Sequence, residues 1–487
     1  MGSACGRATA SPDTLQRIMS KHRAPVPAAS QTGAGRNRRL TPRRTPQDNV
    51  RAAAGWVLER TLRSLAPVES FLDSAMSRFD ERDQGLLHEL VMGSLRWLRR
   101  LDHVIARASN RRFDQIEEAL HSPLRIAAYQ LLFLDRVPAH AAVHEAVEQA
   151  HQVTHRGGAS FVNGVLRHIA RAPSLEDWPV EEPDPVRRLA IELSHPDFLV
   201  ERWLDRFGAV RTRELLAANN RPKPMQLLAF RDRGGRELLA EALIDEGLEI
   251  EPAALSSLGL IVRRGNPLAT AAFSRGDLYI QDEASQAAAL IPPPRPGESI
   301  LDAAAAPGGK SFALLAREPR VRLTLADISL ARAEVLRANC SRLRRALPLV
   351  LADAGAPPWR GTFDRVILDL PCTGTGTLRR HPELKWRISE GEIGRLSRQA
   401  LRLLDGAAPH VAPGGILVAI TCSLEREENE DVVARFLAQC PGFAPLSLAE
   451  LAEAPPAGSL SGPGSWRILT GGDHDGFSVH VLAKARI

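Results

Sequence analysis

Two of the five cysteines, Cys372 and Cys422, stand where chemistry is expected, because each closely follows a short apolar run typical of a β-strand. Most free cysteines are small buried hydrophobes, and Cys340 and Cys440, on predicted helices or helix ends, are interpreted in that way. Strand ends of an α/β sheet instead bind ligands. A thiolate there is a nucleophile when an electropositive or helix-N-terminal setting lowers its pKa. Asp369, three residues before Cys372, is placed to act on the same substrate.

A glycine-containing turn supplies a second candidate site. Residues 302–311 have the sequence DAAAAPGGKS and begin at the end of an apolar run. Such a turn lets backbone approach a ligand closely and points the N–H groups of the following helix at it. The GxGxxG fingerprint does not fit, since only Gly308 and Gly309 are present, and a G-x4-G-K-S phosphate loop would need glycine in place of Ala304. A nucleotide hydrolase is therefore disfavoured, although it stays an alternative.

Aspartates end or follow successive apolar runs in this part of the chain. Asp327 lies 19 residues after Gly308, the place where an acid binds the ribose hydroxyls of an adenosine cofactor. Asp353 follows the next run, where it would reach the adenine edge, and Asp302 and Asp369 end two further runs. A single aspartate at such a position is more often a cap or turn residue. Several at successive strand ends favour a nucleoside site.

These residues need a scaffold that brings strand ends together. From Ser299 onward short apolar runs alternate with helical patterns. The runs are Ser299–Ala303, Arg322–Ala326, Leu349–Ala352, Arg365–Leu368, Ile416–Thr421 and Phe477–Ala483. Strands interleaved with helices predict a mainly parallel, doubly wound α/β sheet of Rossmann-like type, with ligands beyond the carboxyl ends of its strands.

The part of the chain before these runs has a different pattern of apolar residues. Between Pro46 and Arg171 apolar residues recur at helical spacing in Ala52–Leu65, Leu86–Leu98, Leu101–Ala108, Pro123–Leu134, Val143–Val153 and Phe161–Ile169. This pattern predicts an all-α domain of six or seven helices. A linker rich in proline and acidic residues follows at 172–186, then further helix to Leu216. Short runs around a helix at Glu237–Glu246 indicate a small α+β module.

Length and composition exclude several classes. A chain of 487 residues predicts two or three domains. No apolar run reaches membrane-spanning length, no secretory signal is evident, and the cysteines are too sparse for a disulfide framework or a CxxC metal site. We expect a cytoplasmic protein with no metal. Residues 1–50 carry nine Lys and Arg against two acids, so the net charge of +6 reflects a basic tail predicted to be disordered. That tail is either a phosphate-contacting arm or dispensable.

Two basic clusters lie within the predicted folded part. Arg96, Arg99, Arg100, Arg107, Arg111 and Arg112 form the first, and Arg379, Arg380, Lys385 and Arg387 the second. The first is interpreted as a solvated helix face in preference to a phosphate-contacting stripe. The second is equally a solvated loop or part of a basic groove.

Longer segments carry a family resemblance. DAAAAPGGK, DLPCTGTG and TCSLEREENE, around Lys310, Cys372 and Cys422, resemble motifs of S-adenosyl-L-methionine-dependent RNA cytosine-5 methyltransferases. The segments LVMGSLR, YQL, PAHAAVHEA and FVNGVLR in the helical part resemble the NusB-type RNA-binding domain. Together they are similar to the bacterial 16S rRNA methyltransferases of the RsmB (Fmu/Sun) family, from about Thr45 to the C-terminus.

The resemblance implies a role for each matching residue. Cys422 would be the nucleophile that attacks C6 of cytosine, Cys372 would assist proton removal at C5 and release of the enzyme, and Asp369 would share a proton with N3. Asp327 would hold the ribose of the cofactor and Asp353 the adenine, with Asp369 between cofactor and base. The turn that would wrap the methionine end consists of Ala304, Ala305, Ala306, Pro307, Gly308, Gly309 and Lys310.

The resemblance also implies the domain organisation. We expect a disordered basic extension at 1–44, a NusB-like helical domain at 45–172, a helical and α+β RNA-binding module at 187–290, and the methyltransferase domain at 291–487. The expected partner of this monomer is RNA, 16S rRNA before tRNA, with no membrane. A non-catalytic RNA-binding or ribosome-assembly protein is the alternative from another class. Ala304, Leu370 and Thr373 stand where the family usually has cysteine, alanine and serine, and Leu370 would add bulk beside the base pocket.

Overall fold

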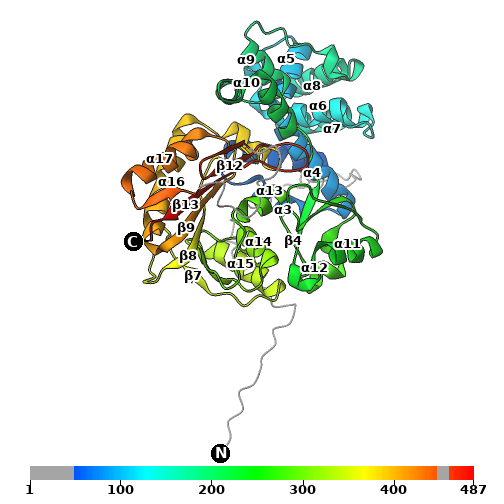
Figure 1. The fold of residues 1–487 in the computed structure, drawn as a ribbon. Coiled ribbons are helices and arrows are strands. Elements are labelled where there is room, and N and C mark those ends of the chain that lie inside the picture. The colour runs from blue at the N-terminus through cyan, green and yellow to red at the C-terminus, as the bar shows by residue number, and fades with distance from the viewer. Residues whose placement is uncertain (1–48, 447–459, 487) are drawn as a thin grey trace, which may run out of the picture. The chain divides into compact units, whose positions relative to one another are not determined.

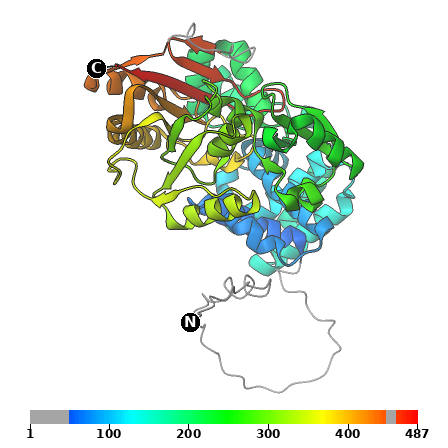
Figure 2. The same cartoon turned by 60° about the horizontal axis from the view of Figure 1, so that its bottom comes forward.

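The N-terminal part of the computed structural model is a helical bundle, as predicted. The structure describes residues 49–446 and 460–486, so the basic extension lies outside the described residues. The bundle comprises α2 (Val50–Arg63), α3 (Val68–Met76), α4 (Glu81–Arg96), α5 (Leu98–Ser109), α6 (His121–Phe133), α7 (Ala139–Val153) and α8 (Arg156–Arg171). These helices, blue and cyan in Figure 2, share one apolar core. Side-chain caps fix two helix starts, since Asn49 accepts from Arg51 N at 2.8 Å and Asp80 from Asp83 N at 2.9 Å.

The first arginine cluster is a solvated helix face only in part. Arg107, Arg111 and Arg112 are exposed, as the interpretation expects. Arg96 and Arg100 are each 6% exposed, so for these two side chains both interpretations are corrected. Arg100 Nη2 donates to the carbonyl oxygens of Leu175 and Trp178, both at 2.9 Å, and Trp178 packs into the bundle core. Charged side chains are buried only when their donors find acceptors. Arg100 therefore anchors the segment that the sequence indicated as a linker.

The next part of the chain forms a small sheet with helices. It contains α9 (Pro185–Glu192), α10 (Asp197–Asn219), β1 (Met225–Ala229), α11 (Gly235–Asp245), β2 (Glu249–Pro252), β3 (Gly259–Arg264), α12 (Ala271–Arg275), β4 (Leu278–Ile280) and α13 (Glu283–Ala289). The strands are antiparallel in the order β2-β3-β1-β4. The α+β module is therefore confirmed, while the short strand β4 was not predicted.

A larger mixed sheet follows. Its parallel strands are β5 (Ser299–Asp302), β6 (Arg322–Asp327), β7 (Leu349–Leu351), β8 (Phe363–Asp369) and β9 (Val411–Thr421), and its antiparallel strands are β10 (Phe443–Pro445), β11 (Leu460–Gly462), β12 (Ser465–Ile468) and β13 (Phe477–Lys484). The helices are α14 (Gly309–Arg317), α15 (Leu330–Arg342), α16 (Glu390–Ala407) and α17 (Glu430–Gln439). All six predicted strands are present, and the antiparallel hairpin β11–β12 extends the sheet beyond them.

Helices cover both faces of this sheet. Alternate residues of the strands face opposite sides, so Ile300 packs with residues of α13, α14 and α15, whereas Leu301 packs with residues of α16 and α17. Figure 1 shows α14 and α15 on one side of the strands and α16 and α17 on the other. Burial on both faces explains why the strands are near-continuous apolar runs in the sequence.

The strand order indicates where a ligand would bind, namely at the carboxyl ends of the central strands. The order is β11-β12-β13-β9-β8-β5-β6-β7, so the chain runs outward from β5 through β6 and β7 and then returns to β8 on the other side of β5. Ligands of such sheets bind beyond the carboxyl ends of the strands at this switch point. Asp302 ends β5 and Asp369 ends β8 there. Across residues 49–446 and 460–486, no helix has the length and apolar character required to cross a bilayer.

Candidate active site

The two predicted cysteines meet at the carboxyl edge of the large sheet. Cys372 lies in the loop after β8 and Cys422 in the loop after β9, two parallel neighbours. Their Sγ atoms are 3.5 Å apart. Backbone hydrogen bonds fix the loops to each other, because Leu370 N donates to Ile420 O and Gly376 N to Cys422 O, both at 2.8 Å. The pairing of thiols from segments 50 residues apart is thus a product of strand adjacency.

The surroundings make the two thiols chemically different. Donation from the Cys372 S–H group lowers the pKa of Cys422, although burial and Asp369 act in the opposite direction. Positive charge on Lys310 and His381 also lowers the pKa of Cys422. The same sulfur–sulfur contact, together with burial, raises the pKa of Cys372 well above its ordinary value. Of the two thiols, Cys422 therefore loses its proton more readily.

Lys310 and Asp369 form an ion pair beside the thiols. Lys310 Nζ lies 2.5 Å from Asp369 Oδ2. Burial lowers the pKa of Lys310, but Asp369 outweighs this effect and holds the pKa above its ordinary value. Asp302, 1% exposed, accepts from Ser311 Oγ at 2.6 Å, and burial raises its pKa to about 6. The site thus combines a pair of thiols, a carboxylate and a fixed ammonium group.

Glu428 braces the loop that carries Cys372. Its Oε1 accepts from Thr373 N at 2.8 Å and its Oε2 from Thr373 Oγ1 at 2.7 Å. Glu428 is 1% exposed, and burial raises its pKa to about 7 in spite of these hydrogen bonds. Asn429, next in the chain, donates to Ser423 O at 3.1 Å and to Glu425 O at 2.7 Å. Together these side chains hold the two cysteine loops in register.

Glu428→Gln is expected to remove a pH-dependent loss of stability. A folded-state pKa raised from 4.5 to about 7 means that the contribution of Glu428 is fully present below pH 4.5 and is lost as pH rises through about 7. The neutral amide does not titrate. The unfolding free energy of the wild type, measured in urea, should therefore fall relative to that of the variant between pH 4.5 and about 7. A constant difference over this range would contradict the assignment.

The turn after β5 has the shape of a small-molecule cradle. Ala305 and Ala306 are buried, Ala304, Gly309 and Lys310 are half-buried, and Pro307 is exposed. Gly308 has φ 116°, and a Cβ there would lie 2.2 Å from Phe312, so only glycine fits. Small side chains therefore leave the backbone open at the start of α14. The G-K-S alternative gains no support, since Lys310 pairs with Asp369 and Ser311 with Asp302.

Two further aspartates flank this turn. Asp327 is 1% exposed, and its Oδ2 accepts from Ala306 N at 3.2 Å while its Oδ1 accepts from Ser329 N at 2.9 Å. Asp353 is more exposed and pairs with Arg402 at 2.9 Å, which lowers its pKa. Asp327 thus ties the turn to the end of β6. Asp353 lies just beyond the end of β7, farther along the same edge.

The surroundings of several residues near the site were not predicted from the sequence. Leu370 is 4% exposed and belongs to the apolar cluster that contains residues of α16, while its effect on a base pocket stays a prediction. Glu428 lies in the segment TCSLEREENE, but its contact with the loop of Cys372 depends on the fold. In the second basic cluster, Arg379 is 3% exposed and Lys385 fully buried, so neither is a solvated loop residue nor groove lining. Arg379 donates to three carbonyl oxygens, those of Arg221, Pro222 and Gly472.

Comparison with known families agrees with this arrangement. The NusB family matches residues 49–171, the ferredoxin-like domain of RsmF/B-type methyltransferases matches 195–269, and 16S rRNA methyltransferase RsmB/F matches 289–464. Fold and site together define a ribosomal RNA methyltransferase with a helical NusB domain and the fold of S-adenosylmethionine-dependent enzymes.

Sequence identity to two relatives indicates which ribosomal RNA methyltransferases the chain resembles. A ribosomal RNA small subunit methyltransferase B of Pseudomonas syringae pv. tomato is 34% identical over 446 residues, covering 90% of this chain and 97% of that protein. A probable ribosomal RNA small subunit methyltransferase B of Bacillus subtilis is 35% identical over 382 residues, 76% of this chain and 84% of that protein. The chain belongs to the family of ribosomal RNA small subunit methyltransferases B.

Solved structures share the fold. The crystal structure of PH0851 superposes with a TM-score of 0.73 at 24% identity, covering 90% of this chain and 99% of that one. A methyltransferase homologue from Pyrococcus horikoshii superposes with a TM-score of 0.52 at 25% identity, covering 62% of this chain and 99% of that one.

Proposed function

We propose that this enzyme methylates C5 of a cytosine in 16S rRNA, with S-adenosyl-L-methionine as methyl donor, through a covalent bond between Cys422 and C6 of the base. The observation that carries the proposal is the 3.5 Å approach of Cys372 and Cys422 beside the Lys310–Asp369 pair. A non-catalytic RNA-binding protein has no need of two thiols held in this way. The relatives named for the small ribosomal subunit favour 16S rRNA over tRNA.

The turn after β5 and the aspartates beside it suit the cofactor. S-adenosylmethionine supplies, when bound, an electrophilic methyl group on a sulfonium. We assign the methionine end to the turn from Ala304 to Lys310, the ribose to Asp327 and the adenine edge to Asp353. The small side chains of the turn and the carboxylate fixed at the end of β6 support this fit. Asp369 lies between this turn and the thiols.

The protein groups then divide the work of the reaction. The Cys422 thiolate attacks C6, forming an S–C6 bond and leaving electron density at C5, which takes the methyl group. Asp369, positioned by Lys310, shares a proton with N3 and stabilises charge in the ring. Cys372 assists removal of the C5 proton, after which the C5–C6 double bond reforms and the S–C6 bond breaks. The products are 5-methylcytosine, S-adenosyl-L-homocysteine, the proton from C5 and the free Cys422 thiolate.

The target base must leave its stack, because C6 is not accessible to a thiolate inside a helix. Sequence-specific recognition of RNA is directed mostly at loops and unstacked bases. We propose that the regions 45–172 and 187–290 hold the surrounding RNA while the cytosine enters the site. The NusB family match of residues 49–171 supports this division.

Transfer of tritiated methyl groups from S-adenosylmethionine to unmethylated 16S rRNA tests the proposal. We expect label in 16S rRNA that co-chromatographs with 5-methylcytidine after digestion to nucleosides. Unmethylated tRNA serves as the competing substrate. Label in another nucleoside would overturn the chemistry, whereas label in tRNA alone would overturn the substrate.

A further inference from the structure

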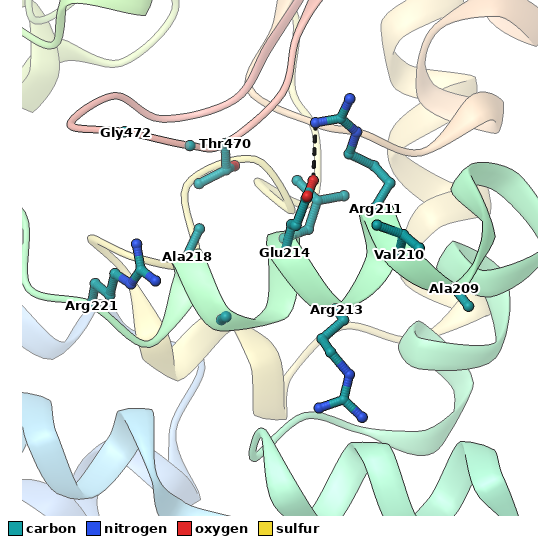
Figure 3. Close-up of a pocket in the computed structure, with 12 residues that line it drawn as sticks. Ala209, Val210, Arg211, Arg213, Glu214, Ala218, Arg221, Thr470 and Gly472 are labelled. Carbon is teal, nitrogen blue, oxygen red and sulfur yellow. Dashed lines mark hydrogen bonds and ion pairs between the residues drawn. The ribbon is translucent and has the colours of Figure 1, made fainter.

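A groove of about 630 Å³ lies between the C-terminal half of α10 and the loop at residues 470–472. Figure 3 shows the helix along one side of the groove and the loop with Thr470 and Gly472 along the other. Arg211 and Arg221 stand toward the two ends of this helical wall. Nothing in the active-site chemistry described above uses these residues.

A break in α10 separates two kinds of arginine. Gly208, with φ 74°, interrupts the helix. Before it, Arg202 pairs with Glu425 at 2.9 Å and Arg206 with Glu430 at 2.8 Å, so both are occupied in fixing the helix to the loop after Cys422. After it, the arginines are exposed and held weakly, which leaves their charge available to a ligand.

The exposed arginines at the groove make few interactions with the rest of the protein. The Arg211 side chain is 56% exposed and its one partner, Glu214 at 3.0 Å, is 57% exposed. Exposed pairs of this kind contribute little to stability. Arg221 is exposed, and among residues 49–446 and 460–486 its guanidinium has no hydrogen-bond or ion-pair partner. Arg213 points to the other side of the helix and pairs with Glu192 at 3.5 Å.

The groove is joined to the catalytic loops through Gly376. Thr470 Oγ1, in the loop wall, donates to Gly376 O at 2.9 Å. Gly376 N in turn donates to Cys422 O at 2.8 Å. Two hydrogen bonds therefore connect the groove wall to the backbone of the nucleophile.

The rest of the lining suits a nucleic acid strand. Val210 is 77% exposed at the groove and presents an apolar surface to a ligand. Alanine and glycine make up much of the remaining wall, leaving room for ribose and base, and Glu214 in that wall is paired with Arg211. Arg211 lies in α10 and Arg221 just after its end at Asn219. The helix between them rises about 12 Å, so the two arginines can contact phosphates of different nucleotides. Arginines at both ends and small or apolar side chains between them suit single-stranded RNA.

We propose that this groove binds the single-stranded RNA next to the target cytosine, with Arg211 and Arg221 on its phosphates and Val210 against a sugar or base. The inference rests on the proposed function, because it takes the occupant of the neighbouring site to be an RNA cytosine. It assigns the groove a positioning role for the substrate strand and no part in the bond changes at the base.

The test compares the double variant R211A/R221A with the matched control R320A/R395A. The control arginines are 73% and 54% exposed, are ion-paired and lie outside the groove, so both variants lose the same charge. Binding of an unmethylated 16S rRNA transcript is measured by filter retention at several salt concentrations. We expect R211A/R221A to bind about tenfold more weakly. The slope of log K against log salt should fall by roughly 0.7 for each arginine removed.

Methyl transfer separates this proposal from the proposed function. R211A/R221A should show a raised KM for RNA, with kcat at saturating RNA and cofactor affinity unchanged. Binding equal to that of R320A/R395A would overturn the RNA-binding role of the groove and leave the methylation chemistry standing. Groove-dependent RNA binding by a wild type that methylates nothing would overturn the chemistry and leave the groove. A wild type that binds no RNA would overturn both.

Discussion

Cys422→Ala is expected to abolish methyl transfer to RNA while S-adenosylmethionine still binds. Removal of a nucleophile costs about 10⁴-fold or more in kcat, because no other group takes over its bond to the substrate. Cys422 lies outside the turn from Ala304 to Lys310, so cofactor affinity measured by calorimetry should stay within about twofold of wild type. Transfer of tritiated methyl groups to 16S rRNA supplies the activity readout.

Cys440→Ala provides the matched control for this variant. Cys440 is a half-buried cysteine at the end of α17, and its Sγ has no hydrogen-bond partner among the residues that the structure describes. This variant should transfer methyl groups as the wild type does. If Cys422→Ala retains more than a small fraction of the activity, Cys422 is not the nucleophile, whatever the state of the cofactor site.

Cys372→Ala is expected to accumulate a covalent protein–RNA complex. With Cys422 intact the S–C6 bond still forms, but proton removal at C5 and release of the enzyme lose their assisting thiol. When the S–C6 bond forms at a normal rate but breaks slowly, the covalent intermediate becomes the dominant species. Denaturing electrophoresis with labelled RNA should show a band of retarded protein. Mass spectrometry after nuclease digestion should place the nucleotide on Cys422.

The sulfur–sulfur contact sets the conditions for that experiment. Cys372→Ala removes the S–H donor that lowers the pKa of Cys422, so the pKa of the nucleophile rises and attack slows near neutral pH. Incubation at a pH above the wild-type optimum should restore adduct formation. If Cys422→Ala traps RNA and Cys372→Ala loses transfer altogether, the roles of the two thiols are exchanged.

The sequence predicts the scaffold well because its signals are local. Apolar runs interleaved with helical patterns predicted every parallel strand of the large sheet, and three- and four-residue spacing predicted the helical bundle. Strands β4, β10, β11 and β12 have three or four residues each and were not predicted. Strands β5 and β7 are as short, but they adjoin clear helical patterns, which made them recognisable. The four missed strands are instead defined by their antiparallel pairing with β1, with β13 or with one another.

The same distinction applies to the site. The position of Cys372 and Cys422 at strand ends was predicted, and their approach follows from the adjacency of β8 and β9. The pairing of Lys310 with Asp369 was not predicted, because it joins residues 59 apart in the sequence. A run of basic residues indicates an exposed segment only when the side chains donate their hydrogen bonds to water and not to other parts of the protein. Lys385 instead donates to Arg96 O, 289 residues away, and is buried.

The loop that begins just after Cys372 limits how far this chain can be dissected. Trp386 Nε1 donates to Leu95 O at 2.8 Å, and Arg387 Nη2 to Thr61 O at 2.8 Å, both in the helical bundle. A fragment lacking that bundle would expose the Trp386 indole without its acceptor. It would also deprive the buried Lys385 ammonium of Arg96 O, one of three oxygens to which it donates. Since Lys385 stands only thirteen residues after Cys372, the damage would lie next to the thiols. To graft the catalytic region onto another RNA-binding module, the new module would therefore have to supply the acceptors that the helical bundle provides for this loop. Joining the two chains would not be enough.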